Sequence, residues 1–308
     1  MSKIFVVGSI NVDYVISVEQ MPMIGESKNG HGFIINQGGK GANQAIACKK
    51  LGCEDVSLIA AVGKDENGEK LIKIIHSYGI NTSSMYQDEH SNSGACIIVL
   101  DESKNDNMLI IDKGANQSIK KEHFEKYLEE NAKPGDILIT QLEINLDSVY
   151  FALTKAKEMG LYTILNPAPV TKIDEQYLRY VDLIIPNETE TKLFTGIDVV
   201  DEESASQAYK WFEEKGVKEL IITLGSKGSI YFSGNRIERC SARKVTAVDT
   251  TSAGDTFIGA VAYMLSQKED ILSAMKFASV AASITVSRYG AGQSIPTFDE
   301  VKKIINNL

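Results

Sequence analysis

An acidic residue stands at the entry to an apolar helix in residues 247–260, which read AVDTTSAGDTFIGA. The acid is Asp255, and the small residues Ala253 and Gly254 directly precede it. Backbone N–H groups at a helix start can stabilise the negative charge of a phosphoryl group in transfer, and a carboxylate beside them can accept the proton of the attacking hydroxyl. The segment therefore indicates phosphoryl transfer, with Asp255 as the general base. The alternative is that Asp255 only completes a helix N-terminus.

Polar residues also follow two apolar runs of the chain. Asn11 and Asp13 come after residues 4–8, and Glu143 comes after residues 137–142. In open α/β sheets ligands bind beyond the carboxyl ends of the strands, so we expect these side chains at one edge of a sheet. They offer acceptors for several hydroxyl groups, which suits a polyol and disfavours a substrate that already carries phosphate. Taken alone, each residue is also typical of an ordinary turn.

A glycine-rich stretch, residues 38–45 (GGKGANQA), leads directly into a helical run. Glycine permits close backbone approach, and a helix N-terminus supplies free N–H donors. The stretch is not a Walker A loop, because the Lys is not followed by Ser or Thr, and it does not match G-x-G-x-x-G. By itself it fits either a ligand-binding turn or a cluster of glycines that packs helices together.

Short runs rich in Val and Ile alternate with segments of helical period along most of the chain. The runs that we interpret as buried strands are residues 4–7, 56–62, 137–142, 162–165, 183–185 and 220–224. Helices are expected over residues 43–50, 67–78 and 147–159, and the last two of these stop at a glycine. The alternation predicts an α/β fold with a doubly wound, mostly parallel sheet covered on both faces.

Two stretches, residues 14–37 and 94–112, break this rhythm, because they carry strand-like runs without intervening helices. We interpret them as a small antiparallel β lid that projects from the main domain; the alternative is an edge extension of the main sheet. The predicted organisation is an α/β catalytic core of residues 1–12, 38–93 and 113–308, and a β lid of residues 13–37 and 94–112.

Composition narrows the class of protein. The chain has 308 residues, 43% of them hydrophobic, which is enough for a sizeable core. Its formal net charge is −9 and no run of Lys or Arg forms a stripe, so a nucleic acid is not expected as a partner. Neither a leader peptide nor an apolar run of membrane-spanning length is recognisable, and we expect a cytoplasmic protein. The four cysteines are scattered, and we expect reduced thiols rather than disulfides or a metal site: Cys48, Cys53, Cys96 and Cys240.

In their order along the chain, these segments resemble the motifs of the phosphofructokinase-B type of sugar kinases, and among them the ribokinase family. The resemblance covers essentially the whole length. Its segments are residues 8–13 (GSINVD), 38–45, 141–143 (QLE), 166–169 (NPAP), 187–190 (NETE), 223–228 (TLGSKG) and 249–260.

The resemblance implies a ribokinase-like fold, a homodimer formed through the lids, and transfer of the γ-phosphate of ATP to O5 of D-ribose. It implies that Asp255 is the base and that Gly254 and its neighbour Ala253 form the anion hole. The residues that would hold the sugar are Asn11, Asp13, Gly39, Lys40, Asn43, Glu143 and Asp255. Those that would serve the nucleotide are Asn187, Thr223, Gly225, Ser226, Gly228, Gly254 and Ser279.

The resemblance also implies two metal ions. Mg²⁺ would accompany the ATP, with Glu190 acting through water. A monovalent cation, usually K⁺, would lie near the anion hole, at positions that match Asp249, Thr251, Thr285, Arg288, Gly290 and Ser294. Asp249 also has a simpler interpretation, which is that it caps its own turn through backbone N–H groups.

Few positions depart from the family's pattern. Thr251 stands at a variable position whose backbone carbonyl would bind the cation, and Ser279 replaces the Asn or His that relatives place beside the adenine. Two alternatives stay open: a kinase for 2-deoxyribose, another small unphosphorylated sugar or a nucleoside, and a non-catalytic sugar-binding protein. Asn11 favours ribose, because its amide can pair with a hydroxyl that deoxyribose lacks. The intact Asp255 and Gly254 disfavour a non-catalytic protein.

Overall fold

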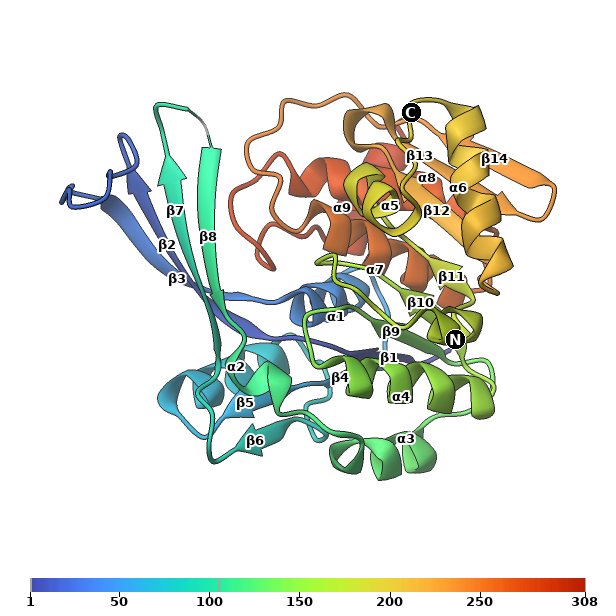
Figure 1. The fold of residues 1–308 in the computed structure, drawn as a ribbon, viewed down its shortest axis with the longest axis horizontal. Coiled ribbons are helices and arrows are strands. Elements are labelled where there is room, and N and C mark those ends of the chain that lie inside the picture. The colour runs from blue at the N-terminus through green and yellow to red at the C-terminus, as the bar shows by residue number, and fades with distance from the viewer. Residues whose placement is uncertain (1, 105, 308) are drawn as a thin grey trace.

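The computed structural model describes residues 2–104 and 106–307. Met1, Asn105 and Leu308, which fall within the predicted domain ranges, lie outside the described residues. Figure 1 shows a large layered body and a small sheet that projects from it. The predicted fold class, a doubly wound and mostly parallel α/β sheet with a small β lid, is confirmed.

The large sheet has eight strands in the order β14-β13-β12-β11-β10-β9-β1-β4. All its strands pair in parallel except β12 with β13 and β13 with β14. Their bounds are β1 Ile4–Val7, β4 Val56–Ile59, β9 Ile137–Thr140, β10 Tyr162–Leu165, β11 Leu183–Ile184, β12 Glu219–Thr223, β13 Ser229–Ser233 and β14 Arg236–Cys240. A separate parallel pair joins β5 (Ala61–Gly63) to β6 (Tyr86–Asp88).

Helices cover both faces of the large sheet, and each face has its own apolar core. The side chains of β1 explain this division, because Ile4 and Val6 belong to one core and Phe5 and Val7 to the other. The first core is covered by α1 Lys40–Lys50, α2 Glu66–Ser77, α7 Ala253–Ser266, α8 Ile271–Thr285 and α9 Phe298–Ile305. The second is covered by α3 Glu125–Asn131, α4 Leu146–Glu158, α5 Glu188–Thr195 and α6 Glu202–Glu214. Four short 3₁₀ helices complete the described elements: Gly114–Gln117, Lys121–His123, Glu175–Tyr180 and Gly225–Lys227.

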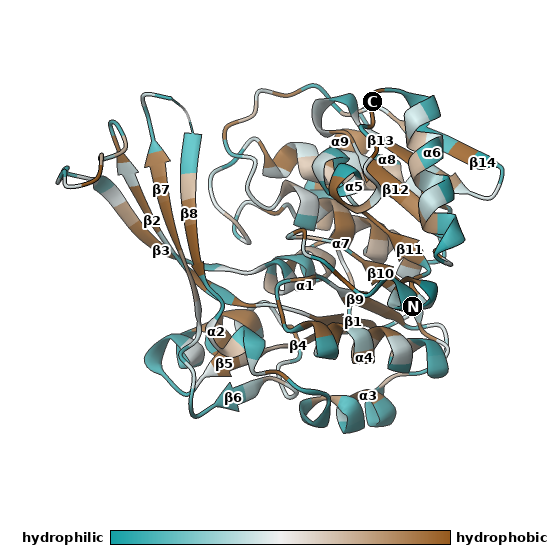
Figure 2. Ribbon diagram, in the orientation of Figure 1, coloured by the Kyte–Doolittle hydropathy of each residue, from teal (hydrophilic) through white to brown (hydrophobic). Residues whose placement is uncertain are grey.

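The lid is a four-stranded sheet in the order β3-β2-β7-β8. Its strands are β2 Asn11–Val18, β3 His31–Gly38, β7 Gly94–Asp101 and β8 Asp106–Asp112. The two outer pairs are antiparallel, as predicted, whereas the central strands β2 and β7 run parallel. Figure 2 shows apolar residues along the lid strands, including the parts that project from the main body.

Several elements match the sequence-based prediction and others do not. The bounds of β1 and β10 are those predicted, because short apolar runs begin and end sharply there. The hairpin β13–β14 was not predicted, since charged residues interrupt its second strand.

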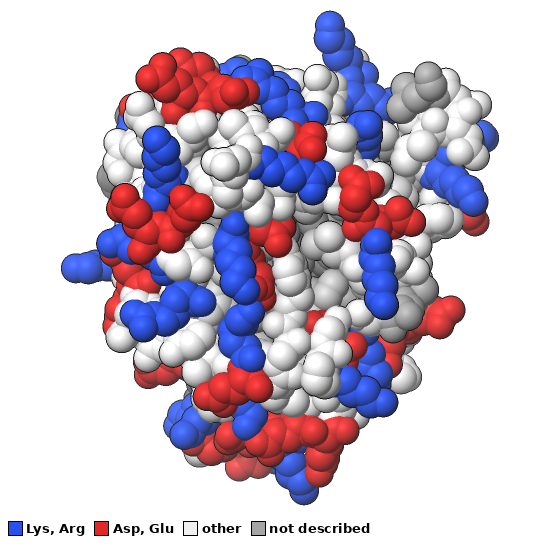
Figure 3. Space-filling model, turned by 90° about the vertical axis from the view of Figure 1, so that its right-hand side faces the viewer, with Lys and Arg blue, Asp and Glu red and all other residues white. Residues whose placement is uncertain are grey.

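None of the helices in the described ranges combines the length and apolar character needed to cross a bilayer. On the face drawn in Figure 3, Lys and Arg side chains are interspersed with Asp and Glu.

Candidate active site

The site is built around the first turn of α7. Ser252 precedes this helix with a φ of 60°, a left-handed conformation that turns the chain abruptly into the helix. The N–H of Ala253 donates to Thr250 O at 3.2 Å, which closes the turn. The N–H groups of Gly254 and Asp255 have no hydrogen-bond partner in the part of the chain that the structure describes. Two amides at the positive end of α7 are therefore available to an anion.

Gly254 leaves the approach to these amides open. A Cβ placed on Gly254 would meet no atom within 4 Å, so the space beside the helix start is clear. The side chain of Asp255, by contrast, is 7% exposed. Its Oδ2 accepts a hydrogen bond from Asn43 Nδ2 at 3.2 Å, and its Oδ1 accepts one from Gln44 Nε2 at 3.0 Å.

The predicted glycine-rich stretch brings these two amides to Asp255 by packing α1 tightly against the start of the chain. Gly39 has a φ of 91°, and a Cβ there would lie 2.7 Å from Ile10 Cα. At Gly41 a Cβ would lie 2.6 Å from the backbone of Gly8 and Ser9. The glycines therefore pack the start of α1 against the turn after β1, and the helix directs polar side chains towards Asp255. That the stretch binds a ligand stays a prediction.

Lys40, the first residue of α1, is the cation of the site. Burial alone would favour the neutral amine, but the carboxylates of Asp255, Glu143 and Glu190 outweigh it and hold the pKa of Lys40 above its ordinary value. The pKa of Asp255 is raised, first because of burial, although Lys40 and the amide of Gln44 oppose the shift. A buried carboxylate whose pKa is raised, with a cation beside it, has the properties of a proton acceptor.

Asn11 and Asp13 lie at the base of the lid, in the first residues of β2, and both are buried. Gly38 pairs with Asn11 across the sheet, and a Cβ on it would lie 2.0 Å from Asp13 Oδ2, so the Asp13 carboxylate occupies the space that glycine leaves free. Burial, and then the charge of Glu143, raise the pKa of Asp13 from 3.8 to about 7. Asp13 is therefore poised to change its charge near neutral pH.

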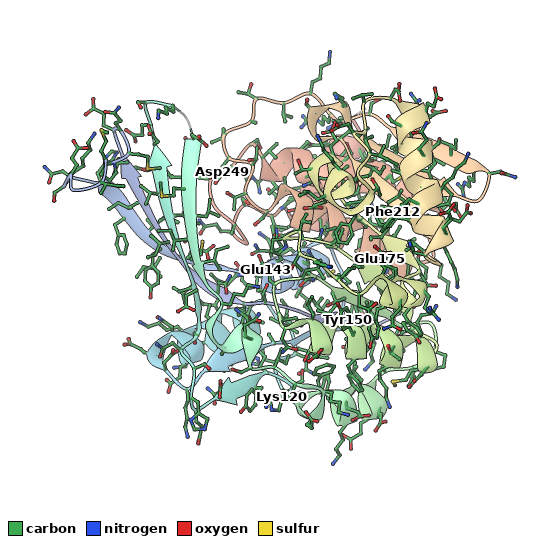
Figure 4. The ribbon with its side chains drawn as sticks, viewed as in Figure 1. Lys120, Glu143, Tyr150, Glu175, Phe212 and Asp249 are labelled. Carbon is green, nitrogen blue, oxygen red and sulfur yellow. The ribbon has the colours of Figure 1, made fainter. Side chains whose placement is uncertain are left out.

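Glu143 lies between the residues at the base of the lid, Asn11 and Asp13, and the start of α1. Its Oε2 accepts hydrogen bonds from the Ser9 hydroxyl and from the backbone N–H of Lys40, the latter at 3.0 Å. Figure 4 labels Glu143 beside α1, at the foot of the lid. The strand ends after β1 and β9 thus meet at one edge of the sheet, as expected for adjacent parallel strands.

A cavity of about 210 Å³ opens in front of Asp255. Six predicted residues line it: Lys40, Asn187, Glu190, Thr223, Gly254 and Asp255. Six further residues that sequence reasoning did not assign also line it: Asn166, Ala168, Ile185, Thr250, Ser252 and Ile258. The cavity therefore joins Asp255, the free amides and three of the predicted nucleotide residues, Asn187, Thr223 and Gly254, in one space. The predicted sugar residues Asn11, Asp13, Asn43 and Glu143 are not part of its lining.

The predicted nucleotide residues divide into two groups. Asn187 caps α5, and its backbone N–H and side chain donate to the Glu190 carboxylate at 2.9 and 3.0 Å. The pKa of Glu190 is raised, mainly by burial. Gly225 and Gly228 form a turn after β12 with φ values of 54° and 107°. They lie outside the cavity lining, as do Ser226 and Ser279, whose hydroxyl donates to Ser241 O at 3.3 Å.

The six candidate cation residues are only partly brought together. Asp249 accepts hydrogen bonds from the backbone N–H groups of Thr251 and Gly290, both at 2.9 Å, so it caps its turn as the simpler interpretation predicts. Figure 4 labels Asp249 on the segment that leads to α7. The other three have partners of their own: Thr285 pairs with Thr256, Arg288 with Glu300, and Ser294 with Ala291 O. Among the residues that the structure describes, no three His, Cys, Asp or Glu side chains converge as a metal site.

Sequence reasoning missed the residues that orient the predicted ones. Asn116 is 1% exposed; its Nδ2 donates to Asn11 Oδ1 at 2.8 Å, and its Oδ1 accepts from Ile10 N at 3.0 Å. Gln44 and Gln141 lie behind Asp255. Gln44 stands inside the glycine-rich stretch, which is the one signal that could have drawn attention to it.

A somewhat larger cavity, of about 260 Å³, lies next to α6 and β13. None of the residues predicted for the site lines it. Of its three acids, Glu188 and Glu202 form ion pairs with Lys227 and Arg239, and Asp201 caps α6. The smaller cavity, where a buried acid meets free helix amides, is therefore the candidate active site.

A doubly wound sheet with a β lid, and an acid beside free amides at a helix start, define a sugar kinase. The profile of the family described as pfkB family carbohydrate kinase matches residues 1–298. The chain belongs to this family and is a carbohydrate kinase of the ribokinase type.

Its relatives include both ribose and deoxyribose kinases. A ribokinase of Haemophilus influenzae is 36% identical over 302 residues, 98% of each chain, and a deoxyribokinase of Salmonella typhi is 34% identical over 304 residues, again 98% of each. Among solved structures, a ribokinase of Thermotoga maritima matches with a TM-score of 0.90 at 34% identity over the whole of both chains. A ribokinase of Arabidopsis thaliana complexed with ribose and ATP matches with a TM-score of 0.91 at 30% identity, covering 99% of this chain and 98% of that one.

Proposed function

We propose that the enzyme transfers the γ-phosphate of ATP to O5 of D-ribose and releases ribose 5-phosphate and ADP. One observation carries the proposal: the Asp255 carboxylate lies at the start of α7, beside the free N–H groups of Gly254 and Asp255, and faces a cavity that Lys40 also lines. The similarity to ribokinases, one of them complexed with ribose and ATP, supports this choice of substrates.

In this mechanism Asp255 accepts the proton of the sugar hydroxyl while that oxygen attacks the phosphorus. The charge that develops on the phosphoryl oxygens is stabilised by the amides of Gly254 and Asp255 and by the ammonium of Lys40. Mg²⁺ prefers oxygen ligands and keeps several waters, so Glu190, a carboxylate on the cavity wall, fits the predicted role through water. When bound with ATP, the ion would neutralise phosphate charge. The remaining nucleotide contacts would come from Asn187, Thr223, the Gly225–Gly228 turn and Ser279.

The sugar would lie between the base of the lid and Asp255. Asn11, Asp13 and Glu143 supply donors and acceptors for its hydroxyl groups, together with Gly39, Lys40 and Asn43. Asn116 holds the oxygen of the Asn11 amide, so Asn11 presents its NH₂ group as a donor. A donor fixed in this way favours a sugar with a hydroxyl at the matching position over one that lacks it.

The direct test is ADP release with purified enzyme, ATP and Mg²⁺ against ribose, 2-deoxyribose, fructose, fructose 6-phosphate and adenosine. We expect kcat/KM to be highest for ribose and lowest for fructose 6-phosphate, whose phosphate meets Asp13 and Glu143. A higher kcat/KM for deoxyribose or adenosine would give the function to that rival substrate. Sugar binding without ADP release would indicate the non-catalytic alternative.

We also propose that K⁺ binds beside the anion hole. Asp249 supplies a full negative charge, its carboxylate bonds to Thr251 and Gly290 hold that loop in place, and the residues between Arg288 and Ser294 can add neutral oxygens. Initial rates in tetramethylammonium buffer, with and without KCl at matched ionic strength, test this. We expect K⁺ to raise kcat more than it alters ribose binding. Unchanged rates, or an Asp249→Ala variant that keeps the activation, would remove the ion from the mechanism.

We further propose that residues 13–37 and 94–112 act as a lid over the sugar, that two lids pack together in a homodimer, and that the enzyme works in the cytoplasm. The apolar residues of β3 and β8 are unusually exposed, with Phe33 at 58%, Ile35 at 59% and Ile110 at 57%. Exposed apolar patches of this kind mark protein contact surfaces. The four cysteines are free thiols, as is usual in a reducing compartment.

A further inference from the structure

Two amide side chains from neighbouring positions of α1 hold the two oxygens of the Asp255 carboxylate. Asn43 was predicted to contact the sugar, but Gln44 has no role in any prediction made from the sequence. Helices α1 and α7 are close enough for this contact because Gly259 has no side chain: a Cβ there would lie 2.4 Å from Ala47 Cβ and 3.0 Å from Gln44 O. The contact between Gln44 and Asp255 is therefore part of how the two helices pack.

The orientation of the Gln44 amide is fixed by its other partners. Gln141 Nε2 donates to Gln44 Oε1 at 2.6 Å, and Gln44 Nε2 donates both to Asp255 Oδ1 at 3.0 Å and to Asn166 Oδ1 at 3.1 Å. Gln44 and Gln141 are both fully buried. If the Gln44 amide were turned over, its oxygen would face two acceptor oxygens and its nitrogen would face a donor, so the Gln44 amide itself has one favourable orientation. Within this network, Gln141 Oε1 on its far side has no hydrogen-bond partner among the described residues.

We propose that Gln44 is a positioning residue of this kinase: its amide fixes the plane of the Asp255 carboxylate, and Gln141 in turn fixes that amide. The inference rests on the proposed role of Asp255 as the base. Gln44 is not part of the cavity lining and its hydrogen bonds go to protein side chains, so it acts through Asp255 rather than on the substrate.

The chemical value of an amide at this position is that it is a neutral donor. The charged groups that act on Asp255 are Lys40 from α1, Glu143 after β9 and Glu190 from α5. A second cation in place of Gln44 would hold the carboxylate ionised and make it a weaker base, whereas no donor at all would leave the buried carboxylate poorly stabilised. The amide gives an intermediate stabilisation and fixes the direction of the accepting oxygen.

Two variants test the proposal. Gln44→Met keeps the length of the side chain but removes the donor, and Gln44→Glu keeps the acceptor for Gln141 but places a second carboxyl beside Asp255. Four quantities are measured: kcat, KM for ribose, the pH profile of kcat/KM, and the titration of Asp255 by carbon-13 carboxyl NMR, assigned with Asp255→Asn. Gln267→Met, which removes an amide from the far end of α7, is the matched control.

For Gln44→Met we expect kcat to fall by roughly 10- to 100-fold, a part of what a general base contributes. KM for ribose should stay close to the wild-type value. In Gln44→Met the pKa of Asp255 and the acidic limb of the pH profile should both move to higher pH. In Gln44→Glu both should move further, by about one pH unit or more, because two carboxyls then compete for one proton. Activity of Gln44→Glu should recover at alkaline pH, and Gln267→Met should match the wild type.

The proposal is overturned if both variants keep the wild-type kcat and Asp255 titration. It is also overturned if activity falls in proportion to a loss of folded protein while the Asp255 titration is unchanged. If Gln44→Met does not fold, Gln44→Glu, which keeps the contact with Gln141, decides alone. Failure of the proposed function has a different signature: the wild type would release no ADP with any sugar, or Asp255→Asn would keep full turnover. The NMR titration would in that case still decide whether Gln44 acts on Asp255.

Discussion

Burial, a neighbouring cation and two hydrogen bonds have opposing effects on the pKa of Asp255. Burial raises its pKa, the ammonium of Lys40 opposes that shift, and the two amides of α1 hold its oxygens. A base that is fully ionised in water would be weak, and one that is fully buried without partners would be protonated. Together these effects keep the pKa of Asp255 above its ordinary value while both carboxylate oxygens stay hydrogen-bonded, as the proposed general base requires.

Replacing Asp255 with Asn keeps the size of the side chain and the start of α7 but removes the proton acceptor. We expect kcat to fall by roughly 10²- to 10⁴-fold, while the dissociation constant for ribose changes little. Steady-state ADP release and equilibrium binding measure the two effects separately. Because one group of the new amide must face a donor of α1, thermal unfolding of the variant should be compared with the wild type. Near-normal turnover of a folded Asp255→Asn enzyme would exclude the role of Asp255 as the base.

Asp13 predicts a pH dependence of stability. Its pKa is about 7 in the folded protein and 3.8 ordinarily, so between these pH values the folded state binds more protons than the unfolded state. The free energy of unfolding contributed by Asp13 is therefore full below pH about 4 and is lost as the pH rises through about 7. We expect Asp13→Asn to raise the unfolding temperature of the sugar-free enzyme at pH 8 and to change it less at pH 5. Melting curves of both proteins across this range measure the difference; parallel pH dependences would contradict it.

At the scale of the element, the sequence pattern predicts the strand bounds and helix ends that depend on neighbouring residues in the chain. Apolar runs gave β1 and β10 their bounds, and a glycine after Tyr78 and another after Met159 marked the ends of α2 and α4 within a residue or two. Strand ends also predicted the edge at which Asn11, Asp13 and Glu143 meet. The parallel pairing of β2 with β7 and the use of Asn116 were not predictable in this way, because both depend on contacts between segments about 80 to 105 residues apart.

The Asn116–Asn11 contact is made possible by a glycine on a third element. A Cβ on Gly94, the first residue of β7, would lie 2.2 Å from Asn116 Nδ2 and 2.3 Å from Asn11 Oδ1. We expect Asn116→Asp, which removes the donor and repels Asn11 Oδ1, to reverse the Asn11 amide and lower the preference for ribose over deoxyribose. The ratio of kcat/KM for the two sugars measures the effect.

A double-mutant cycle supplies the control for this prediction. If Asn116 acts through Asn11, the variant carrying Asn11→Ala and Asn116→Asp should have the same sugar preference as Asn11→Ala alone. Additive losses in the ratio would show that Asn116 acts by another route.

At the scale of the whole molecule, the exposed lid strands are the surface through which we propose that two chains associate. All the residues of β8 are exposed, and four consecutive ones are apolar, Met108 to Ile111. We expect Ile110→Lys to convert the proposed homodimer to a monomer, because a charge in the middle of this surface would lose its water on association. Sedimentation equilibrium measures the mass. Val200→Lys, a change at an exposed apolar residue outside the lid, is the control and should leave the mass unchanged. A wild-type enzyme that is already monomeric at micromolar concentration would contradict the prediction.

Strand β2 begins at the proposed sugar site and ends towards the tip of the lid, so a tilt of the strand moves residues at both ends. Asn11 and Asp13 are the first and third of its eight residues, and β3 and β7 pair with it along its two edges. At about 3.3 Å per residue, a tilt of about 10° about Asn11 that moves the tip by about 4 Å moves Asp13 by about 1 Å. A displacement of that size breaks a hydrogen bond. If Asn11 and Asp13 hold the sugar as proposed, opening of the lid would break these contacts at the same time, and the phosphorylated sugar could leave no faster than the lid opens.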